Sequence, residues 1–350
     1  MKTCRLCGNR EGNQRFEIRE MLHGTREVFA YLRCASCEAL QIEEIPTDLG
    51  RFYPPDYYSY QVQPRSRLRD WLKHKAARDL VSHDSPLGAI LTRVFEAPEL
   101  LTRVARSGVG FDARILEIGS GAGKNLLDLW HMGFHDVTGV DPYLPEPILH
   151  DEGVTIHKCE ASRLDAEFDL VLLNDVFEHL PDPLQMLRDC RGLLAPQGTL
   201  LLRTPVADSH AWREYGVDWV QIDAPRHLHV HTRKSLELLA SRAGLAITDR
   251  LWDSTAFQFW GSEQYRRDIP IRDAHSYAEN PHASPFSRAQ MREFREQTAR
   301  LNEQGQGDAA CFYLRRQSSE VDAPSCVDDA PVGEVPGGKG LPMDCTAVTR

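Results

Sequence analysis

The stretch from Ile115 to Tyr143, ILEIGSGAGKNLLDLWHMGFHDVTGVDPY, constrains the fold of this chain more than any other. It begins with an apolar run at 115–118 that is typical of a buried strand. Three glycines follow at alternate positions: Gly119, Gly121 and Gly123. A helical pattern then ends at Gly133, and a second apolar run, 137–140, ends in Asp141. This pattern favours nucleotide binding, because glycines let the backbone approach a ligand closely and the terminal acid can accept both hydroxyls of a ribose.

The spacing of the glycines excludes two common phosphate-binding turns. A dinucleotide fingerprint requires G-x-G-x-x-G, but Lys124 stands where the last glycine would be. A phosphate loop requires G-x-x-x-x-G-K-[ST], which is absent here. The order E-x-G-x-G-x-G from Glu117 to Gly123, with Asp141 beyond it, resembles motif I of class I S-adenosylmethionine (SAM)-dependent methyltransferases. The alternative is an ordinary strand–helix–strand unit with a glycine-rich turn.

Strand and helix patterns continue to alternate beyond Asp141, which predicts an α/β fold with a Rossmann-like, doubly wound, seven-stranded sheet. The segments F-D-x-V, E-H-L-x-D-P and L-x-P-x-G-x-L follow in order, so the methyltransferase resemblance covers about Ala113 to Leu251. We expect a helix that begins after Thr232 and stops at Gly244, because these residues suit its two caps. The stretch 204–220 is expected to be a loop over the site.

Two C-x-x-C pairs near the N-terminus are separated by a polar, strand-like stretch. They contain Cys4, Cys7, Cys34 and Cys37. Paired spacing of this kind supplies four thiolates to tetrahedral zinc in zinc ribbons, so the sequence predicts a structural Zn²⁺ site. A redox C-x-x-C would stand beside a strand–helix–strand pattern, and neither pair does. Four cysteine ligands leave the metal no open position, so we expect it to stabilise the fold without taking part in a reaction.

These patterns divide the chain into four parts. We expect a zinc ribbon at 1–50, and a linker with helices at 51–110. The SAM-dependent methyltransferase domain is expected at 111–316, with an insert at about 253–308 that holds a helix near 288–302. Residues 317–350 are rich in proline and glycine without a pattern, and we expect a disordered tail.

The family resemblance implies which residues bind the cofactor. The backbone around the three glycines would hold SAM, Asp141 would accept the ribose hydroxyls, and Glu117 would anchor the amino-acid end. Glu160 stands where the family often has an aspartate for the adenine amine. Asn174 and Asp175 would lie beside the methionine portion.

Two histidines are candidates for the base that a hydroxyl or carbon acid would need, because histidine titrates near neutral pH. His227 is the first, since P-x-H-L before a helix resembles the position of a histidine in zinc-ribbon sugar C-methyltransferases. Those enzymes carry Glu-His there, whereas this chain has Arg226-His227. His179 follows a carboxylate at a strand edge and is the second candidate. The alternative for either histidine is a structural hydrogen bond.

The chain of 350 residues has a formal net charge of −10, which argues against non-specific binding to nucleic acid or anionic membranes. It contains no run long enough to span a bilayer, and its N-terminus lacks an apolar signal core, so we expect a cytoplasmic protein. The leading hypothesis is a SAM-dependent methyltransferase acting on a small molecule or glycan, such as a sugar or nucleotide-linked sugar. One alternative is an RNA or protein methyltransferase that uses the ribbon for recognition. Another is a SAM-binding protein without catalysis.

Overall fold

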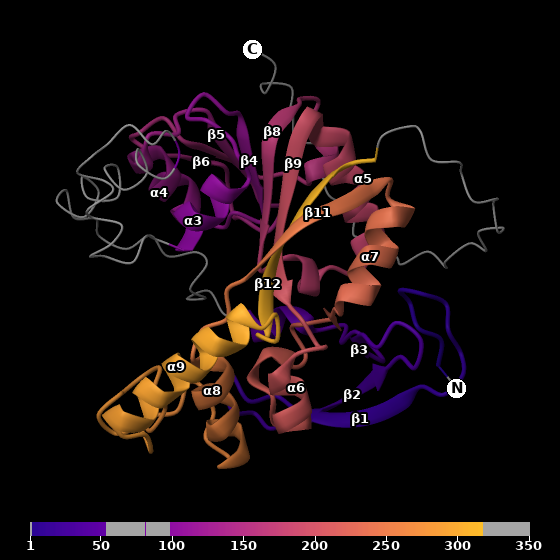
Figure 1. Ribbon diagram of the computed structural model, residues 1–350, viewed down its shortest axis with the longest axis vertical. Helices are drawn as coiled ribbons and strands as arrows, with labels where there is room; N and C mark the ends of the chain where they lie inside the picture. The colour runs from indigo at the N-terminus through magenta and orange to yellow at the C-terminus, as the bar shows by residue number, and fades with distance from the viewer. Residues whose placement is uncertain (1, 54–80, 82–98, 318–350) are drawn as a thin grey trace.

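The computed structural model describes residues 2–53, 81 and 99–317 (Figure 1). Several expectations lie outside these residues, including the linker up to residue 98, apart from Val81, and the tail beyond Gln317. Within the described part, α3 (Glu99–Arg106) leads into the main sheet.

An eight-stranded sheet forms the centre of the molecule, in the order β11-β12-β9-β8-β4-β5-β7-β6. Its strands are β4 (Ile115–Ile118), β5 (Val137–Val140), β6 (Ile148–Leu149), β7 (Thr155–His157), β8 (Phe168–Asn174), β9 (Leu194–Pro205), β11 (Leu245–Trp252) and β12 (Ala309–Arg316). The five strands from β9 to β7 are parallel, whereas β12 pairs antiparallel with both β9 and β11. The predicted Rossmann-like sheet is confirmed. It has one strand more than the seven that were predicted, because the two-residue strand β6 pairs antiparallel with β7 at the edge of the sheet.

Helices cover both faces of this sheet, because the parallel strands alternate their apolar side chains between two cores. Leu116, Val171 and Leu200 face the core that contains Leu187 and Leu236. Those last two residues belong to α5 (Pro183–Leu193) and α7 (Arg233–Arg242). The neighbouring strand positions face the core of α3 and α4 (Lys124–Met132), on the other side (Figure 1). The sheet is therefore doubly wound, as expected.

The N-terminal residues form a second sheet, in the order β1-β2-β3-β10. Its first three strands are β1 (Gln14–Arg19), β2 (Val28–Arg33) and β3 (Leu40–Ile42). Its fourth strand is β10 (His229–Val230), which comes from the methyltransferase half of the chain. A 3-10 helix, η1 (Leu49–Phe52), follows β3. We call residues 2–53 the N-terminal module, and its sheet is completed by a strand that no local pattern connects to it.

A third apolar core joins the N-terminal module to the insert. It contains Tyr31, Trp219 and Phe259, among others. The insert contributes α8 (Phe257–Arg266) and α9 (Arg288–Glu303), and the latter confirms the expected helix. Figure 1 shows α6, α8 and α9 beside the N-terminal strands, below the main sheet.

The expectation of a loop at 204–220 is wrong. β9 extends to Pro205, and α6 (His210–Tyr215) follows, then the 3-10 helices η5 (Gly216–Asp218) and η6 (Val220–Ile222). The side chain of Ser209 caps α6 by accepting a hydrogen bond from the backbone N of Trp212. Burial of Ala211, Trp212 and Tyr215 on the third core holds this helix in place.

Candidate active site

The glycine turn brings the backbone close to neighbouring strands at the carboxyl edge of the sheet. Gly119 has φ 71°, and a Cβ placed on it would lie 2.6 Å from Cγ2 of Val176. A Cβ on Gly123, φ 81°, would lie 2.7 Å from Cδ1 of Ile156. Both positions therefore require glycine, and α4 begins directly afterwards at Lys124.

Glu117 is buried at the end of β4, under the glycine turn. Its Oε1 accepts hydrogen bonds from the Nδ2 atoms of Asn125, at 2.7 Å, and Asn174, at 3.2 Å. Its Oε2 is buried and has no hydrogen-bond partner among the described residues. Burial raises the pKa of Glu117 to about 7, although the two amides oppose this shift. The unsatisfied oxygen is a site at which a cationic ligand group would compensate for lost hydration.

Asp141 lies at the end of β5, next to the same turn. Its Oδ2 accepts a hydrogen bond from the backbone N of Gly121 at 3.0 Å, and its Oδ1 accepts one from the N of Tyr143 at 2.9 Å. The carboxylate is thus fixed at the turn, where it can exchange a backbone donor for ligand hydroxyls.

The other three residues predicted for the cofactor lie in different surroundings. Asn174 joins Glu117 at the end of β8, and its Oδ1 is buried without a hydrogen-bond partner in the described part of the chain. Asp175 is exposed and forms an ion pair with Arg203. Glu160 is exposed and precedes the 3-10 helix η3 (Ala161–Arg163). The structure therefore brings Asn174 and Glu117 together and turns Asp175 towards a different partner.

His227 is buried and has a defined hydrogen-bond arrangement. Its Nδ1 lies 2.8 Å from the carbonyl oxygen of Gln221 and must donate a proton to it. In the neutral ring this leaves Nε2 as the acceptor, 3.8 Å from Oδ2 of Asp223 and 3.9 Å from Oε1 of Glu178. Burial lowers the pKa of His227, against the charge of Asp223, so the ring is neutral and able to accept a proton.

His179 packs edge-on against His227, with ring centroids 4.7 Å apart. It lies in the 3-10 helix η4 (Phe177–His179), and its Nδ1 is 2.9 Å from the carbonyl oxygen of Arg226. The hydroxyl of Tyr53 is 3.1 Å from the same nitrogen. Burial, reinforced by His227, lowers the pKa of His179 to about 4. The two predicted candidates for the base therefore share one cluster.

Glu178 completes this cluster, and the sequence analysis did not single it out. It is fully buried, and its Oε2 accepts a hydrogen bond from Oγ1 of Thr204 at 2.9 Å. Burial, with help from Asp175, raises its pKa to about 8. The signal in the sequence was the Glu-His pair directly after the central strand, of which only the histidine was chosen.

The half-buried Asp223 and the buried Arg226 form an ion pair next to His227. Arg226 Nε donates to Oδ2 of Asp223 at 2.8 Å, and its Nη2 pairs with Oδ1. Burial would raise the pKa of Asp223, but the charge and hydrogen bonds of Arg226 lower it to about 2. Arg226 is also 3.5 Å from Oε1 of Glu20, in the N-terminal module. No local pattern in the sequence connects Glu20 to this site.

His229 and His231 alternate with His227 in the sequence but lie in different surroundings. Their rings lie 5.8 Å apart, whereas the ring of His227 packs against His179. His229 Nδ1 is 3.1 Å from the carbonyl oxygen of Leu180, and the ring of His231 packs on Phe177 at 4.7 Å. Both side chains are buried, so they belong to the core between the two sheets.

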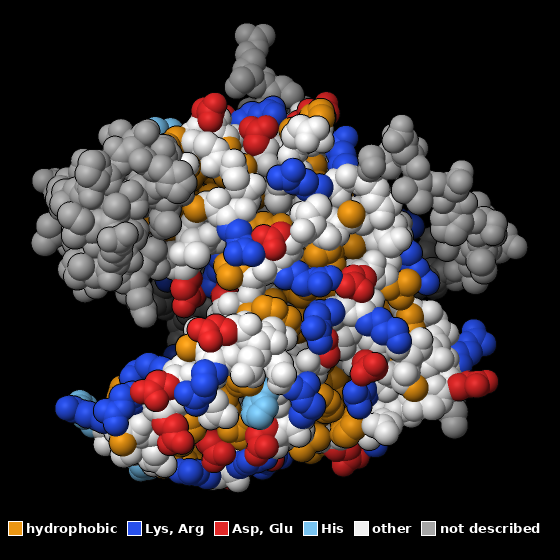
Figure 2. All heavy atoms as spheres, viewed as in Figure 1, with side chains coloured by type: hydrophobic (Ala, Val, Ile, Leu, Met, Phe, Trp, Pro, Cys, Tyr) orange, Lys and Arg blue, Asp and Glu red, His pale blue; other side chains and the backbone are white. Residues whose placement is uncertain are grey.

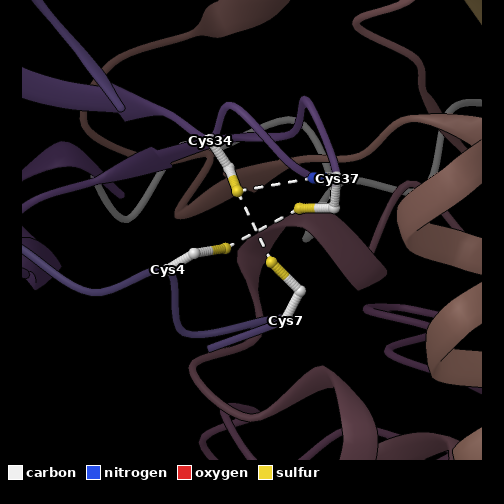
Figure 3. A group of neighbouring side chains, drawn as sticks. All are labelled: Cys4, Cys7, Cys34 and Cys37. Atoms are coloured by element: carbon white, nitrogen blue, oxygen red, sulfur yellow. Dashed lines mark hydrogen bonds between the residues drawn. The ribbon is translucent and has the colours of Figure 1, made fainter. Parts of the chain in front are cut away.

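The four N-terminal cysteines converge on one point, although their two pairs are far apart in the sequence (Figure 3). Their sulfur atoms all lie within 4.8 Å of one another. Cys4 Sγ and Cys37 Sγ are 3.7 Å apart, and Cys7 Sγ and Cys34 Sγ are 3.4 Å apart. Tetrahedral zinc with bonds of about 2.3 Å needs sulfurs about 3.8 Å apart, so the donor set fits this metal.

The chain is similar in sequence to curated proteins that are named as methyltransferases. The curated relatives include the ubiquinone biosynthesis O-methyltransferase of Cereibacter sphaeroides, 33% identical over 153 residues, which are 39% of this chain and 62% of the relative. The enzyme of the same name from Aeromonas salmonicida is 30% identical over 162 residues, covering 41% of this chain and 67% of the relative. The chain thus spans less than two thirds of the first relative.

Solved structures that the chain matches include the 1,6-didemethyltoxoflavin-N1-methyltransferase of Burkholderia thailandensis. It is 18% identical, with a TM-score of 0.38 over 74% of this chain and 94% of that one. A possible histamine N-methyltransferase of Thermotoga maritima is 18% identical, with a TM-score of 0.39 over 70% of this chain and 99% of that one.

The sequence model of the "Methyltransferase domain" family matches residues 67–249, which include the glycine turn, Asp141 and the histidine cluster. This match covers more than half of the 350 residues. The chain belongs to the methyltransferase-domain family.

Proposed function

We propose that this protein transfers the methyl group of SAM to a small-molecule acceptor, with Glu117, Asp141 and the glycine turn as the cofactor site. The observation that carries this proposal is the buried Oε2 of Glu117 beside the turn, which has no hydrogen-bond partner among the residues that the structure describes. SAM is a cation with an ammonium group, so a buried carboxylate oxygen favours it over ligands that carry a pyrophosphate. Asp141 at the end of the next strand supplies the acceptor for the ribose hydroxyls.

His227 is the proposed base. When bound, SAM supplies a methyl group on a positively charged sulfur, which is transferred to a nucleophile in line with the departing sulfur. The nucleophile is a hydroxyl or an acidic carbon whose proton passes to Nε2 of His227. This nitrogen is available because Nδ1 donates to Gln221. The neighbouring Glu178 and Asp223 would stabilise the charged ring that results.

The proposed acceptor class is a sugar or a nucleotide-linked sugar. The resemblance of the segment around His227 to zinc-ribbon sugar methyltransferases supports this class. The relatives' names favour a second candidate, O-methylation of another hydroxylated small molecule. Basic and acidic side chains are interspersed over the face in Figure 2, so this face offers no extended basic surface to a nucleic acid. Among the described residues, no helix has the length and apolar character required to cross a membrane.

The cysteine cluster is the proposed site of a structural zinc ion. Its four sulfurs have the spacing that tetrahedral zinc requires, and they fill every ligand position. The apolar side chains of the N-terminal module lie in cores that it shares with the rest of the chain, so a bound metal would add a cross-link within the module itself.

Calorimetric titration with S-adenosylhomocysteine and with NADH tests the cofactor assignment. We expect the first to bind, and Asp141→Ala to weaken binding by roughly tenfold to a hundredfold, the effect of losing a charged hydrogen-bond pair. Affinity for NADH with indifference to S-adenosylhomocysteine would overturn the proposed function.

A further inference from the structure

The segment that contains His227 is held by the N-terminal module. We call residues 223–232 the base segment. Within it, β10 pairs with β3 through His229 opposite Gln41 and Val230 opposite Leu40. The backbone N of Ile42 donates to the carbonyl oxygen of Leu228 at 2.9 Å. Two residues of the base segment, His229 and Val230, are therefore a strand of the N-terminal sheet, although they lie in the methyltransferase half of the sequence.

The second cysteine pair is joined directly to the end of the base segment. Oγ1 of Thr232 donates to the carbonyl oxygen of Cys37 at 2.6 Å. Thr232 also caps α7, whose residue Arg242 donates from Nη1 to the carbonyl oxygen of Leu6 at 2.9 Å. Both cysteine turns thus contact the helix that follows the proposed base.

Tyr31 holds the backbone of His227 itself. Its side chain is fully buried, and its hydroxyl donates to the carbonyl oxygen of His227 at 2.8 Å. A buried hydrogen bond of this kind fixes the backbone from which the imidazole projects. Tyr31 lies on β2, which never reaches the main sheet.

Glu20 contributes a charge to the same segment. Its carboxylate is fully buried and held in the turn after β1, where its Oε1 accepts from the N of His23 at 2.8 Å and its Oε2 from the N of Thr25 at 2.9 Å. Oε1 also lies 3.5 Å from Nη1 of Arg226, a buried nitrogen with no hydrogen-bond partner in the described chain. A row of alternating charges therefore runs from Glu20 through Arg226 to Asp223, beside His227.

The charge balance around His227 depends on this row. The groups that face His227 are Asp223, Glu178, His179 and Arg226, while Tyr31 binds its carbonyl oxygen and Tyr53 contacts His179. Arg226 disfavours a proton on His227, and Asp223 favours it. Glu20 offsets the charge of Arg226, so removal of Glu20 would leave an excess positive charge behind the ring.

We propose that Glu20 and Tyr31 are positioning residues for His227. The N-terminal module would then help to form the methyl-transfer site, because it contributes both residues. This inference rests on the proposed role of His227. On this proposal, the module holds the base segment in place through Tyr31 and β3, and Glu20 balances its charge.

The charge of Glu20 is tested with Glu20→Gln and with Glu17→Gln, an exposed position on the same hairpin. The readout is the pH titration of the His227 ring in NMR spectra of the full chain, with its signal identified by loss in His227→Gln. We expect the His227 pKa to fall by about 0.5 in Glu20→Gln, as for loss of a nearby compensating charge, and to be unchanged in Glu17→Gln. Affinity for S-adenosylhomocysteine should be unaffected in both.

The hydrogen bond of Tyr31 is tested with Tyr31→Phe and with Tyr313→Phe. The control loses a matched bond, because the Tyr313 hydroxyl donates to the carbonyl oxygen of Arg103 at 2.9 Å, away from His227. We expect backbone amides of the base segment to exchange hydrogen about fivefold faster in Tyr31→Phe alone, the effect of one lost buried hydrogen bond.

The inference is wrong if Glu20→Gln and Tyr31→Phe both behave like their controls. Neither readout requires an acceptor, cofactor or turnover. A chain that fails to bind S-adenosylhomocysteine would therefore count against the proposed function, and the ring titration and amide exchange would still decide the role of the module.

Discussion

Nε2 of His227 lies 3.9 Å from Oε1 of Glu178, a buried carboxylate oxygen with no hydrogen-bond partner in the described part of the chain. Burial favours the neutral form of both groups, since it lowers the pKa of His227 and raises that of Glu178 to about 8. A proton taken up by His227 would place a positive charge beside Glu178. This would favour ionisation of Glu178, so each group can stabilise the charged form of the other.

This relationship predicts that Glu178→Gln lowers kcat by roughly tenfold to a hundredfold while the affinity for S-adenosylhomocysteine stays unchanged. Glutamine keeps an oxygen for Thr204 and removes only the ionisable group. Glu146→Gln, at an exposed position, is the control. Methyl transfer to a panel of sugar nucleotides and phenols measures the effect, and a Glu178→Gln variant with full kcat would contradict the pairing.

Affinity for SAM should depend on pH through Glu117. Its pKa is about 7 because it is buried, and the cationic ligand requires its ionised form. We therefore expect affinity to decrease as pH falls from 8 to 6, and Glu117→Gln to remove this dependence and weaken binding by roughly tenfold or more. Calorimetry across this range measures both effects. Glu167→Gln, exposed before β8, should retain the dependence on pH.

The cysteine cluster predicts about one zinc ion per chain in the purified protein. Cys34→Ser should lose the metal and reduce the thermal stability of the protein, whereas Cys190→Ala, in α5, should retain the metal. Elemental analysis by mass spectrometry gives the metal content. Retention of full zinc by Cys34→Ser would exclude this cluster as the site.

Acid should destabilise the fold through its buried histidines. Burial lowers the pKa of His231 to about 3, against 6.5 for an unperturbed ring. Between these values the unfolded chain carries a proton that the folded chain lacks, so stability is present above pH 6.5 and is lost as pH falls towards 3. The substitution His231→Phe removes the ionisable ring and with it this pH-dependent loss of stability.

Comparison of the original protein with His231→Phe isolates the contribution of His231 to the pH dependence of stability. The other titratable groups contribute nearly equally to both proteins. The free energy of unfolding, measured with urea at pH 4 to 6, should fall less steeply for His231→Phe, by about 1.4 kcal/mol per pH unit. Equal slopes would show that His231 is not neutral in the folded protein.

The local elements were predictable from the sequence because their signals lie within a few residues of one another. The strand before Gly119, the helix after Gly123 and the cap at Thr232 each depend on neighbouring side chains. The same holds for α6, where Ser209 and three buried apolar residues gave a helical signal that the loop assignment overlooked.

The contacts that complete the site were not predictable in this way. Glu20 meets Arg226 and β3 meets β10 across about two hundred residues, and no spacing rule connects such distant segments. The ion pair of Asp175 could not be predicted for the same reason, because its partner lies on another strand. The family resemblance implies a cofactor role for Asp175, which stays a prediction, whereas its ion pair with Arg203 depends on the register between β8 and β9. Residue type identifies a candidate, while its partner is set by tertiary pairing.

The position of β12 has a consequence for synthesis of the protein. This strand, Ala309–Arg316, lies between β9 and β11, so both of its neighbours are translated long before it. Until β12 has been translated, β9 and β11 each expose an unpaired edge, and such edges can pair with other chains and cause aggregation. A stop codon before residue 309 would make this exposure permanent, and the truncated product would be a target for chaperones and proteases even though every residue of the candidate site had been made.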